Sequence, residues 1–271
     1  MSMSGRIVVA VWLSAAQATQ PAGNVPTFED VMVAPNDSHE NGMFVNYMRG
    51  RLFVKNWTLR MLIRTSYGVQ DAEIVGGPEW INVDRFNIEA KGDVGNSPAL
   101  PVAHAGDPSR LQLMMQSLLA DHFKLIVHRE RQEADVYTLT LLNGDGRLGP
   151  GLHHSDVDCL ALAVEARQIN SRMRTQPSRC ELSRDGGSLT IGGRPLSQLV
   201  NSLSTMVGKP LVDQTGLTGN FDVRLAWTPD RSSPAASLVK AVREQLGLDL
   251  VLRTRSTEVL VVDRAARPGD R

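Results

Sequence analysis

Apolar residues follow two spacings along this chain: alternate positions in short runs, and every third or fourth position in longer ones. Alternation is typical of half-buried strands, and the longer spacing is typical of amphipathic helices. In the first half, the pattern predicts a strand at 51–54, a helix between Thr58 and Gly68, and strands near Ile74 and at 85–90. Threonine is a common helix N-cap, and glycine commonly ends helices.

A second helix and two further strands complete this first set of elements. Apolar residues at helical spacing mark the helix: Leu111, Met114, Met115, Leu118 and Leu119. Two strands, expected to pair with each other, follow at 123–128 and 136–141.

The second half repeats this order of elements. Its elements are a strand at 189–191, a helix from Pro195 to Gly208, strands at 210–212 and 221–225, a helix over 238–246, and a hairpin of 248–252 with 259–262. Both halves therefore run β-α-β-β-α-β-β. The predicted fold class is α+β, with two tandem repeats that each pack two helices on one face of a small mixed sheet.

The chain divides accordingly into six segments. We expect a signal peptide at 1–18, an N-terminal extension with one strand at 19–50, a first repeat at 51–148, a connector at 149–187, a second repeat at 188–265 and a tail at 266–271.

The first 18 residues have the features of a secretory signal. Arg6 precedes the apolar run 7–13, and Ala16-Gln17-Ala18 matches a small-residue cleavage site. A buried N-terminal strand is the alternative reading of the same run. No other segment reaches the length of a membrane-spanning helix, so we expect an exported, periplasmic or secreted protein whose mature chain has no transmembrane segment.

Charge and composition exclude one class of partner. Lys+Arg and Asp+Glu are equal at 29 each, which leaves no net charge to favour nucleic acid. Apolar residues make up 42% and charged residues 21%, enough for a buried core without a metal framework.

Two cysteines, Cys159 and Cys180, lie 21 positions apart in the connector. In an exported protein such a pair predicts a disulfide that closes a loop. A metal pair or a catalytic thiol is the alternative, but neither cysteine sits in a C-x-x-C type of motif.

The connector and the turn just before it hold the best candidates for chemistry. His153, His154 and Asp156 are the candidate catalytic residues, and Asp145 and Asp158 join them as candidate ligands for Zn²⁺ or Ca²⁺. A metal-bound water there would attack an ester or lactone carbonyl. The spacing matches neither a calcium loop nor a zinc hydrolase motif, so a solvated connector without a cofactor is the main expectation.

A composite site is a further option for the loop at 92–108. His104 and Asp107 contribute to such a site only if the fold brings them near His153 or Asp156. A loop of this length is otherwise an exposed connection.

Five strings carry a family resemblance. They are GGPEW at 76–80, DRFNIEAK at 84–91, LLADHFKL at 118–125, VDQTGLTGNFD at 212–222 and WTPD at 227–230. The chain resembles, over about residues 28–265, an uncharacterised family of exported proteins with a domain of unknown function, expanded in Solibacter-type soil acidobacteria. Its repeated unit is similar to the short N-terminal module of secretins and TonB-dependent receptors. The resemblance implies export and architecture, but no activity and no catalytic residues.

Two functions therefore remain as hypotheses. The first is a non-catalytic envelope module that binds a protein, peptide or glycan, for example by strand addition at a sheet edge. The alternative is a small-molecule hydrolase acting on an ester or lactone, in which His153 or His154 converges with the carboxylates or with His104 around one cavity.

Overall fold

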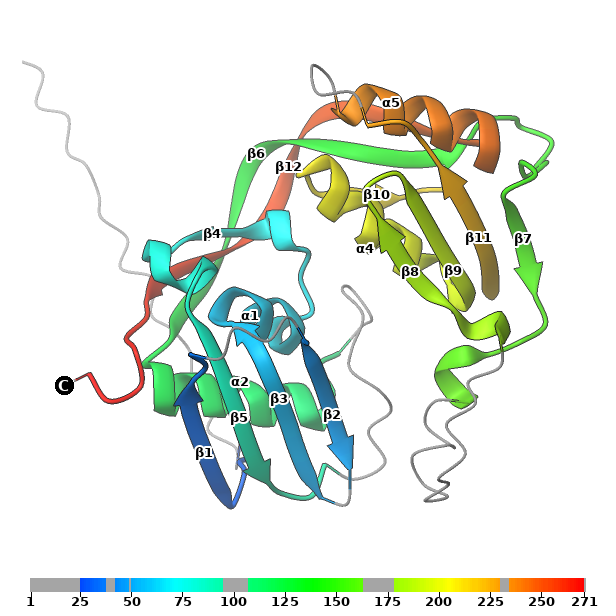
Figure 1. Ribbon diagram of the computed structural model, residues 1–271. Coiled ribbons are helices and arrows are strands. Elements are labelled where there is room, and N and C mark those ends of the chain that lie inside the picture. The colour runs from blue at the N-terminus through cyan, green and yellow to red at the C-terminus, as the bar shows by residue number, and fades with distance from the viewer. Residues whose placement is uncertain are drawn as a thin grey trace, which may run out of the picture.

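Three sheets and the helices that cover them form two lobes joined by a pair of long strands (Figure 1). The computed structural model describes residues 25–37, 42–48, 50–94, 107–162, 178–229 and 234–270. The predicted signal peptide and His104 lie outside these residues. No helix in the described ranges is long and apolar enough to cross a membrane.

The first lobe is built on sheet A, whose four strands lie in the order β1-β5-β3-β2, each antiparallel to its neighbours. Its strands are β1 (Asp30–Pro35), β2 (Phe44–Met48), β3 (Arg51–Thr58) and β5 (Arg85–Lys91). Helices α1 (Leu59–Tyr67) and α2 (Arg110–Phe123) share one apolar core with a face of this sheet. The segment 19–50, for which one strand is predicted, contributes two strands to the sheet.

Local sequence accounts for the ends of both helices. Thr58 Oγ1 accepts a hydrogen bond from Met61 N–H (3.3 Å), and Gly68 closes α1 in the left-handed conformation with φ 61°, which confirms the predicted bounds. In α2, Ser109 and Gln112 form a reciprocal capping box.

The second lobe is built on sheet C, in the order β7-β11-β9-β8, which is again fully antiparallel. Its strands are β7 (Leu152–Ser155), β8 (Leu182–Asp185), β9 (Ser188–Pro195) and β11 (Asn220–Ala226). Its helices are α4 (Leu196–Val207) and α5 (Pro234–Ala241), the latter continuing as a π-helical turn over Val242–Leu246. Strands β7 and β8 come from the segment predicted as a connector, and Pro195 is the N-cap of α4.

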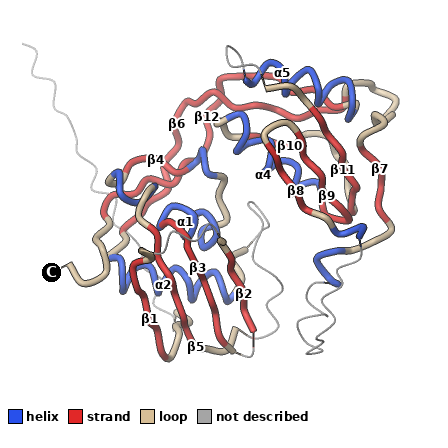
Figure 2. Tube along the Cα trace, viewed as in Figure 1, coloured by secondary structure: helices blue, strands red, loops and turns tan. Residues whose placement is uncertain are grey.

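Sheet B joins the lobes through β6 (Ile126–Leu141) and β12 (Leu248–Arg264), an antiparallel ribbon visible as two long strands in Figure 2. The predicted strand pair 123–128 with 136–141 and the predicted hairpin of 248–252 with 259–262 are therefore wrong, since each pair is part of one continuous strand. The middle of the ribbon is largely exposed because it crosses between two cores. The sequence there is a run of polar residues, which is also typical of a turn.

The two halves of the chain exchange strands through this ribbon. Strands β4 (Ile74–Gly76) and β10 (Leu211–Asp213) pair in parallel with the strand from the other half, β4 with β12 and β10 with β6. Leu260 of β12 is buried in the core of the first lobe, and Leu139 of β6 in the core of the second. The small mixed sheet predicted for each half is therefore absent: sheets A and C are antiparallel, and the mixed sheet is shared.

Three 3₁₀ turns, at Asp71–Glu73, Glu79–Asn82 and Ser178–Cys180, complete the described elements. Gln70, just before the first of them, ties this part of the chain to β10. The Gln70 Nε2 group donates to Leu211 O (2.6 Å), and Leu211 N–H donates to Gln70 Oε1 (2.8 Å). The buried side-chain amide takes the place of a neighbouring strand on this side of β10. It satisfies both the N–H and the C=O group of Leu211.

We expect Gln70→Ala to lower the free energy of unfolding by about 2–4 kcal/mol, because it leaves a buried N–H and a buried C=O without partners. Urea denaturation followed by circular dichroism measures the change. The control is Gln132→Ala at an exposed position of the ribbon, which should stay within about 0.5 kcal/mol of the parent. Equal effects of the two substitutions would contradict this role for Gln70.

A charged contact joins the two strands of the ribbon near the first lobe. His128 Nδ1 lies 2.8 Å from Asp263 Oδ2, and this hydrogen bond, with a smaller effect of Glu130, raises the pKa of His128 above 6.5. A raised folded-state pKa stabilises the fold below the unfolded pKa, and the contribution is lost as pH rises through the folded value. An NMR titration should show the raised pKa in the parent and a lower one in Asp263→Asn, with no such change in Glu258→Gln.

Candidate functional site

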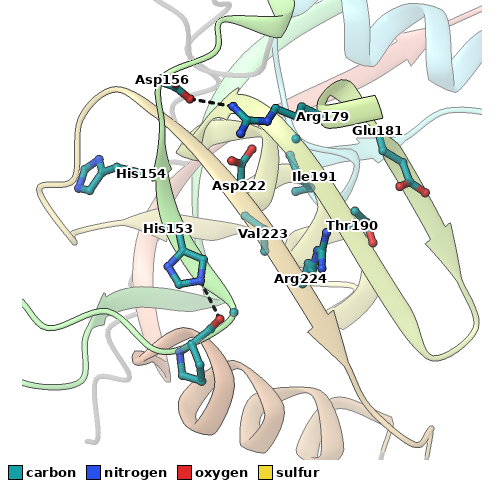
Figure 3. Close-up of a pocket in the computed structure, with 13 residues that line it drawn as sticks. His153, His154, Asp156, Arg179, Glu181, Thr190, Ile191, Asp222, Val223 and Arg224 are labelled. Carbon is teal, nitrogen blue, oxygen red and sulfur yellow. Dashed lines mark hydrogen bonds and ion pairs between the residues drawn. The ribbon is translucent and has the colours of Figure 1, made fainter. Parts of the chain in front are cut away.

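The open face of sheet C carries a hollow of about 630 Å³ (Figure 3). Thr190, Asp222 and Arg224 lie on this face because they alternate with buried residues, of which Val223 and Leu225 belong to the core. The lining residues come from three strands and from the segments beside them: Pro150, Gly151, His153, His154, Asp156, Arg179, Glu181, Thr190, Ile191, Gly192, Asp222, Val223 and Arg224.

A β-bulge forms the floor of this hollow. The register of β9 against β11 shifts between Phe221 and Val223, so Gly192 and Gly193 together oppose Asp222. Gly193 has φ 53°, which glycine adopts readily, and its N–H donates to Asp222 Oδ1 (2.8 Å). The Asp222 carboxylate therefore holds the bulge in place.

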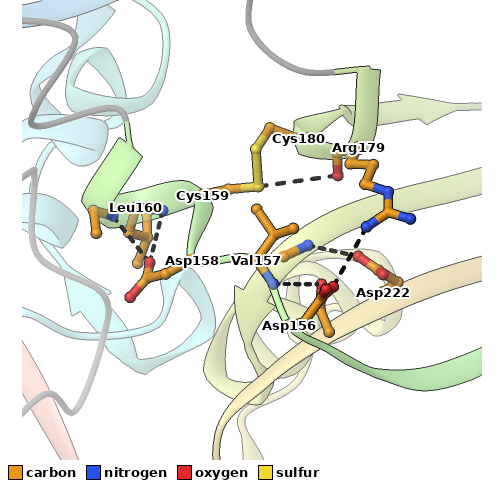
Figure 4. Close-up of a disulfide and its surroundings, with 11 residues drawn as sticks. Asp156, Val157, Asp158, Cys159, Leu160, Arg179, Cys180 and Asp222 are labelled. Carbon is orange, nitrogen blue, oxygen red and sulfur yellow. Dashed lines mark hydrogen bonds and ion pairs between the residues drawn. A yellow bond between two sulfur atoms is a disulfide. The ribbon is translucent and has the colours of Figure 1, made fainter.

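Two segments joined by a disulfide lie on this bulge, and we call residues 156–159 together with 179–181 the disulfide strap (Figure 4). The bond between Cys159 and Cys180 confirms the predicted pairing, and both cysteines are buried. A Cβ at Gly193 would lie 2.6 Å from Cys159 Sγ, and one at Gly192 would collide with Arg179 O. The strap can therefore seat only on a pair of residues without side chains.

Charged groups of the strap form one wall of the hollow. Asp156 Oδ1 and Arg179 Nη1 lie 3.4 Å apart in an exposed ion pair. Asp158 turns away and caps the short helix at 159–162, where its Oδ1 accepts from Leu160 N–H (3.0 Å) and Ala161 N–H (2.9 Å).

The predicted site residues of the connector do not meet at one point. His153 is on the open face of β7, where its Nε2 lies 2.9 Å from Pro150 O. His154 projects to the other side of the strand, with its ring 4.6 Å from that of Phe221. Asp145 Oδ1 accepts from Arg147 N–H (3.0 Å) in the preceding turn.

The metal-dependent form of the hydrolase hypothesis places a Zn²⁺ or Ca²⁺ ion among Asp145, His153, His154, Asp156 and Asp158. Adjacent residues of a strand face opposite ways, so the two histidines cannot converge on one ion. In the part of the chain that the structure describes, no three His, Cys, Asp or Glu side chains are placed to hold a metal.

The electrostatics of the hollow are mixed rather than acidic or basic. Asp156, Glu181 and Asp222 are opposed by Arg179 and Arg224. Among the described residues, neither Arg224 nor Glu181 forms an ion pair. These two side chains are therefore available to charges of a ligand.

Nucleophilic chemistry would need a hydroxyl or carboxylate in hydrogen-bond contact with a base. The ring of His153 contacts a main-chain carbonyl, and no described lining residue hydrogen-bonds to it through a side chain.

Sequence reasoning missed most of the residues that line this hollow. Arg179, Glu181, Thr190, Asp222 and Arg224 were not predicted, since they carry no motif. Two signals were present: paired glycines inside a strand, which are typical of a bulge, and polar residues that alternate with buried ones along β11.

The fold and the hollow define a two-lobed α+β protein with a surface hollow beside a disulfide. A family model described as a protein of unknown function, DUF3738, matches residues 60–265. The chain belongs to this family, which confirms the predicted membership of an uncharacterised domain family. No curated protein and no solved structure matches the chain.

We expect Gly192→Ala to destabilise the protein by about 3 kcal/mol, because the new methyl group overlaps the main chain of the strap. The cost should shrink when Cys159→Ser and Cys180→Ser release the strap, a coupling that a double-mutant cycle measures by urea denaturation. Gly186→Ala is the control, since a Cβ at Gly186 meets nothing within 4 Å. An unchanged cost without the disulfide would show that the strap does not depend on this glycine.

Proposed function

We propose that this protein is an exported, non-catalytic binding module whose ligand site is the hollow on sheet C. The observation that carries the proposal is a surface hollow with charged side chains of both signs, mounted on a bulge and a disulfide. Its volume of about 630 Å³ is within the range of small-ligand pockets. A rigid support reduces the entropy that binding would otherwise cost.

The charges favour a peptide that carries both an acidic and a basic group. Arg224 offers a guanidinium to a carboxylate, and Glu181 offers a carboxylate to an ammonium group. A neutral glycan would leave both charges partly desolvated without a partner, which costs free energy. A short zwitterionic peptide is therefore the ligand class that we propose.

We further propose that the two halves are copies of one unit, and that a glycine pair in the second copy is what lets the strap seat there. In sheet A, Asn56 also has a left-handed φ of 62°, and its N–H donates to Asn87 Oδ1 (3.0 Å), as Gly193 N–H does to Asp222. The bulge thus recurs with a side-chain acceptor at the equivalent position, an amide oxygen of Asn87 in sheet A and a carboxylate oxygen of Asp222 in sheet C. Lys55 and Asn56 stand where the second half has its glycine pair, so no strap can seat on sheet A.

Export is supported by the disulfide and by the first 18 residues. Disulfides form and persist in oxidising compartments such as the periplasm. The basic residue, apolar run and small-residue site at 1–18 are typical of a signal peptide. The proposed location is therefore the periplasm or the medium.

The proposal is tested by NMR titration of the full mature chain with tripeptides that carry one acidic and one basic side chain. We expect amide shifts confined to the surroundings of Thr190, Gly192 and Arg224. Arg224→Glu should weaken binding at least tenfold through charge reversal, and Arg253→Glu on the exposed ribbon should not.

Two outcomes would overturn the proposal. Binding that maps elsewhere, or that is unaffected by Arg224→Glu, would remove the hollow as the site. Turnover of an ester or lactone that is lost in His153→Ala would establish the hydrolase alternative instead.

A further inference from the structure

Strand β1 is an edge of sheet A that lies on the outer margin of the molecule. It pairs with β5 alone among the described strands. Figure 1 shows it at the side of the first lobe that faces away from the second, whereas β2 and β8 are the edges turned toward the space between the lobes. A large partner can therefore approach β1 more readily than those two edges.

At two positions, the main chain of β1 directs hydrogen-bonding groups away from β5, where no described residue accepts or donates to them. Asn36 N–H donates to Arg85 O (2.7 Å), in line with the antiparallel register that pairs Ala34 with Asn87 and Met32 with Glu89. In such a ladder, alternate residues direct their N–H and C=O groups to the same side. Val31 and Val33 therefore direct theirs outward, away from β5.

Edge strands of natural proteins are usually protected by charge, proline or shortness. Strand β1 has its charge and its proline only at its ends, Asp30 and Pro35, and its four central residues are uncharged. Met32 on the open face is 68% exposed, the largest value among the large apolar side chains described. An uncharged edge strand with an exposed apolar side chain is typical of an edge that pairs with another strand.

We propose that β1 pairs with β1 of a second copy of this chain, antiparallel and with a twofold axis at Met32. In this register Val31 of each copy lies opposite Val33 of the other, and their outward N–H and C=O groups satisfy one another. Asp30 lies opposite Ala34, so no like charges meet. The pairing joins two copies of sheet A into one eight-stranded sheet.

The uncharged centre of β1 favours a second copy, because pairing about Met32 brings apolar side chains together and no like charges. Directly opposed residues of an antiparallel pair lie on the same face, so Met32 covers Met32 on the open face and the valines meet on the core side. Isologous pairing about a twofold axis is also the commonest way in which identical chains assemble. A single edge contact buries less surface than a standard interface, so the dimer is weak and depends on concentration.

Cross-linking of Met32→Cys tests this register. At the twofold axis the opposed residues are a non-hydrogen-bonded pair with Cα atoms about 4.5 Å apart, within the range of a disulfide. The matched control is Ala34→Cys on the same face, whose counterparts would be about 13 Å apart. Both native cysteines are already paired, so each variant has one free thiol.

With mild oxidant at high protein concentration, we expect Met32→Cys to form covalent dimers at least tenfold faster than Ala34→Cys. Equal rates would overturn the proposed register. Analytical ultracentrifugation of the parent chain should show a dimer fraction that rises with concentration. Met32→Lys should abolish it through like-charge repulsion, whereas Met43→Lys, at an apolar side chain that is 51% exposed, should not.

A parent chain that stays monomeric over the full concentration range would overturn the dimer itself. Dimers that persist in Met32→Lys would assign association to another surface. Neither result bears on peptide binding, because the hollow is on sheet C and the proposed dimer uses sheet A.

Discussion

The antiparallel pairing of β6 with β12 is the interaction on which the rest of this structure depends. Each long strand begins beside the helix of its own half and ends in the core of the other. Neither core is complete without an apolar segment from the opposite half, such as Leu260 in the first lobe and Leu139 in the second. The two lobes are therefore not independent folding units, and we expect them to unfold in one transition.

The exposed middle of the ribbon follows from the same constraint. A strand that connects two cores has no core to face halfway, so both of its sides are solvated there and polar residues are required. Gln70 adds a second link between the halves, since its buried amide pairs with the main chain of Leu211 in β10 of the second half. The apolar ends of the two strands thus pack in the two cores, and their polar middle crosses the solvated distance between them.

The two β-bulges differ in the side chains they carry, and this difference decides whether a second segment can pack on the sheet. In sheet A the bulge carries Lys55 and Asn56, whose side chains occupy the place that the strap takes on sheet C. In sheet C, Gly192 and Gly193 leave room for the main chain of Arg179 and the sulfur of Cys159 to approach. The disulfide then fixes charged groups above the sheet, and Asp222 serves both to hold the bulge and to line the hollow.

Several features of this protein could be predicted from its sequence because they depend on near neighbours in the chain. Helix α1 could be placed from Thr58 and Gly68, and the pairing of Cys159 with Cys180 from their number and spacing. Strand pairing across more than a hundred residues could not, because the polar middles of β6 and β12 each predict a turn when the sequence is considered locally. The meeting of Arg179 with Gly192, and the separation of His153 from His154, depend on which faces the sheet buries. Local sequence determined the elements and their caps, whereas the tertiary structure decided which polar residues share a surface, because that surface is assembled from strands that are distant in the chain.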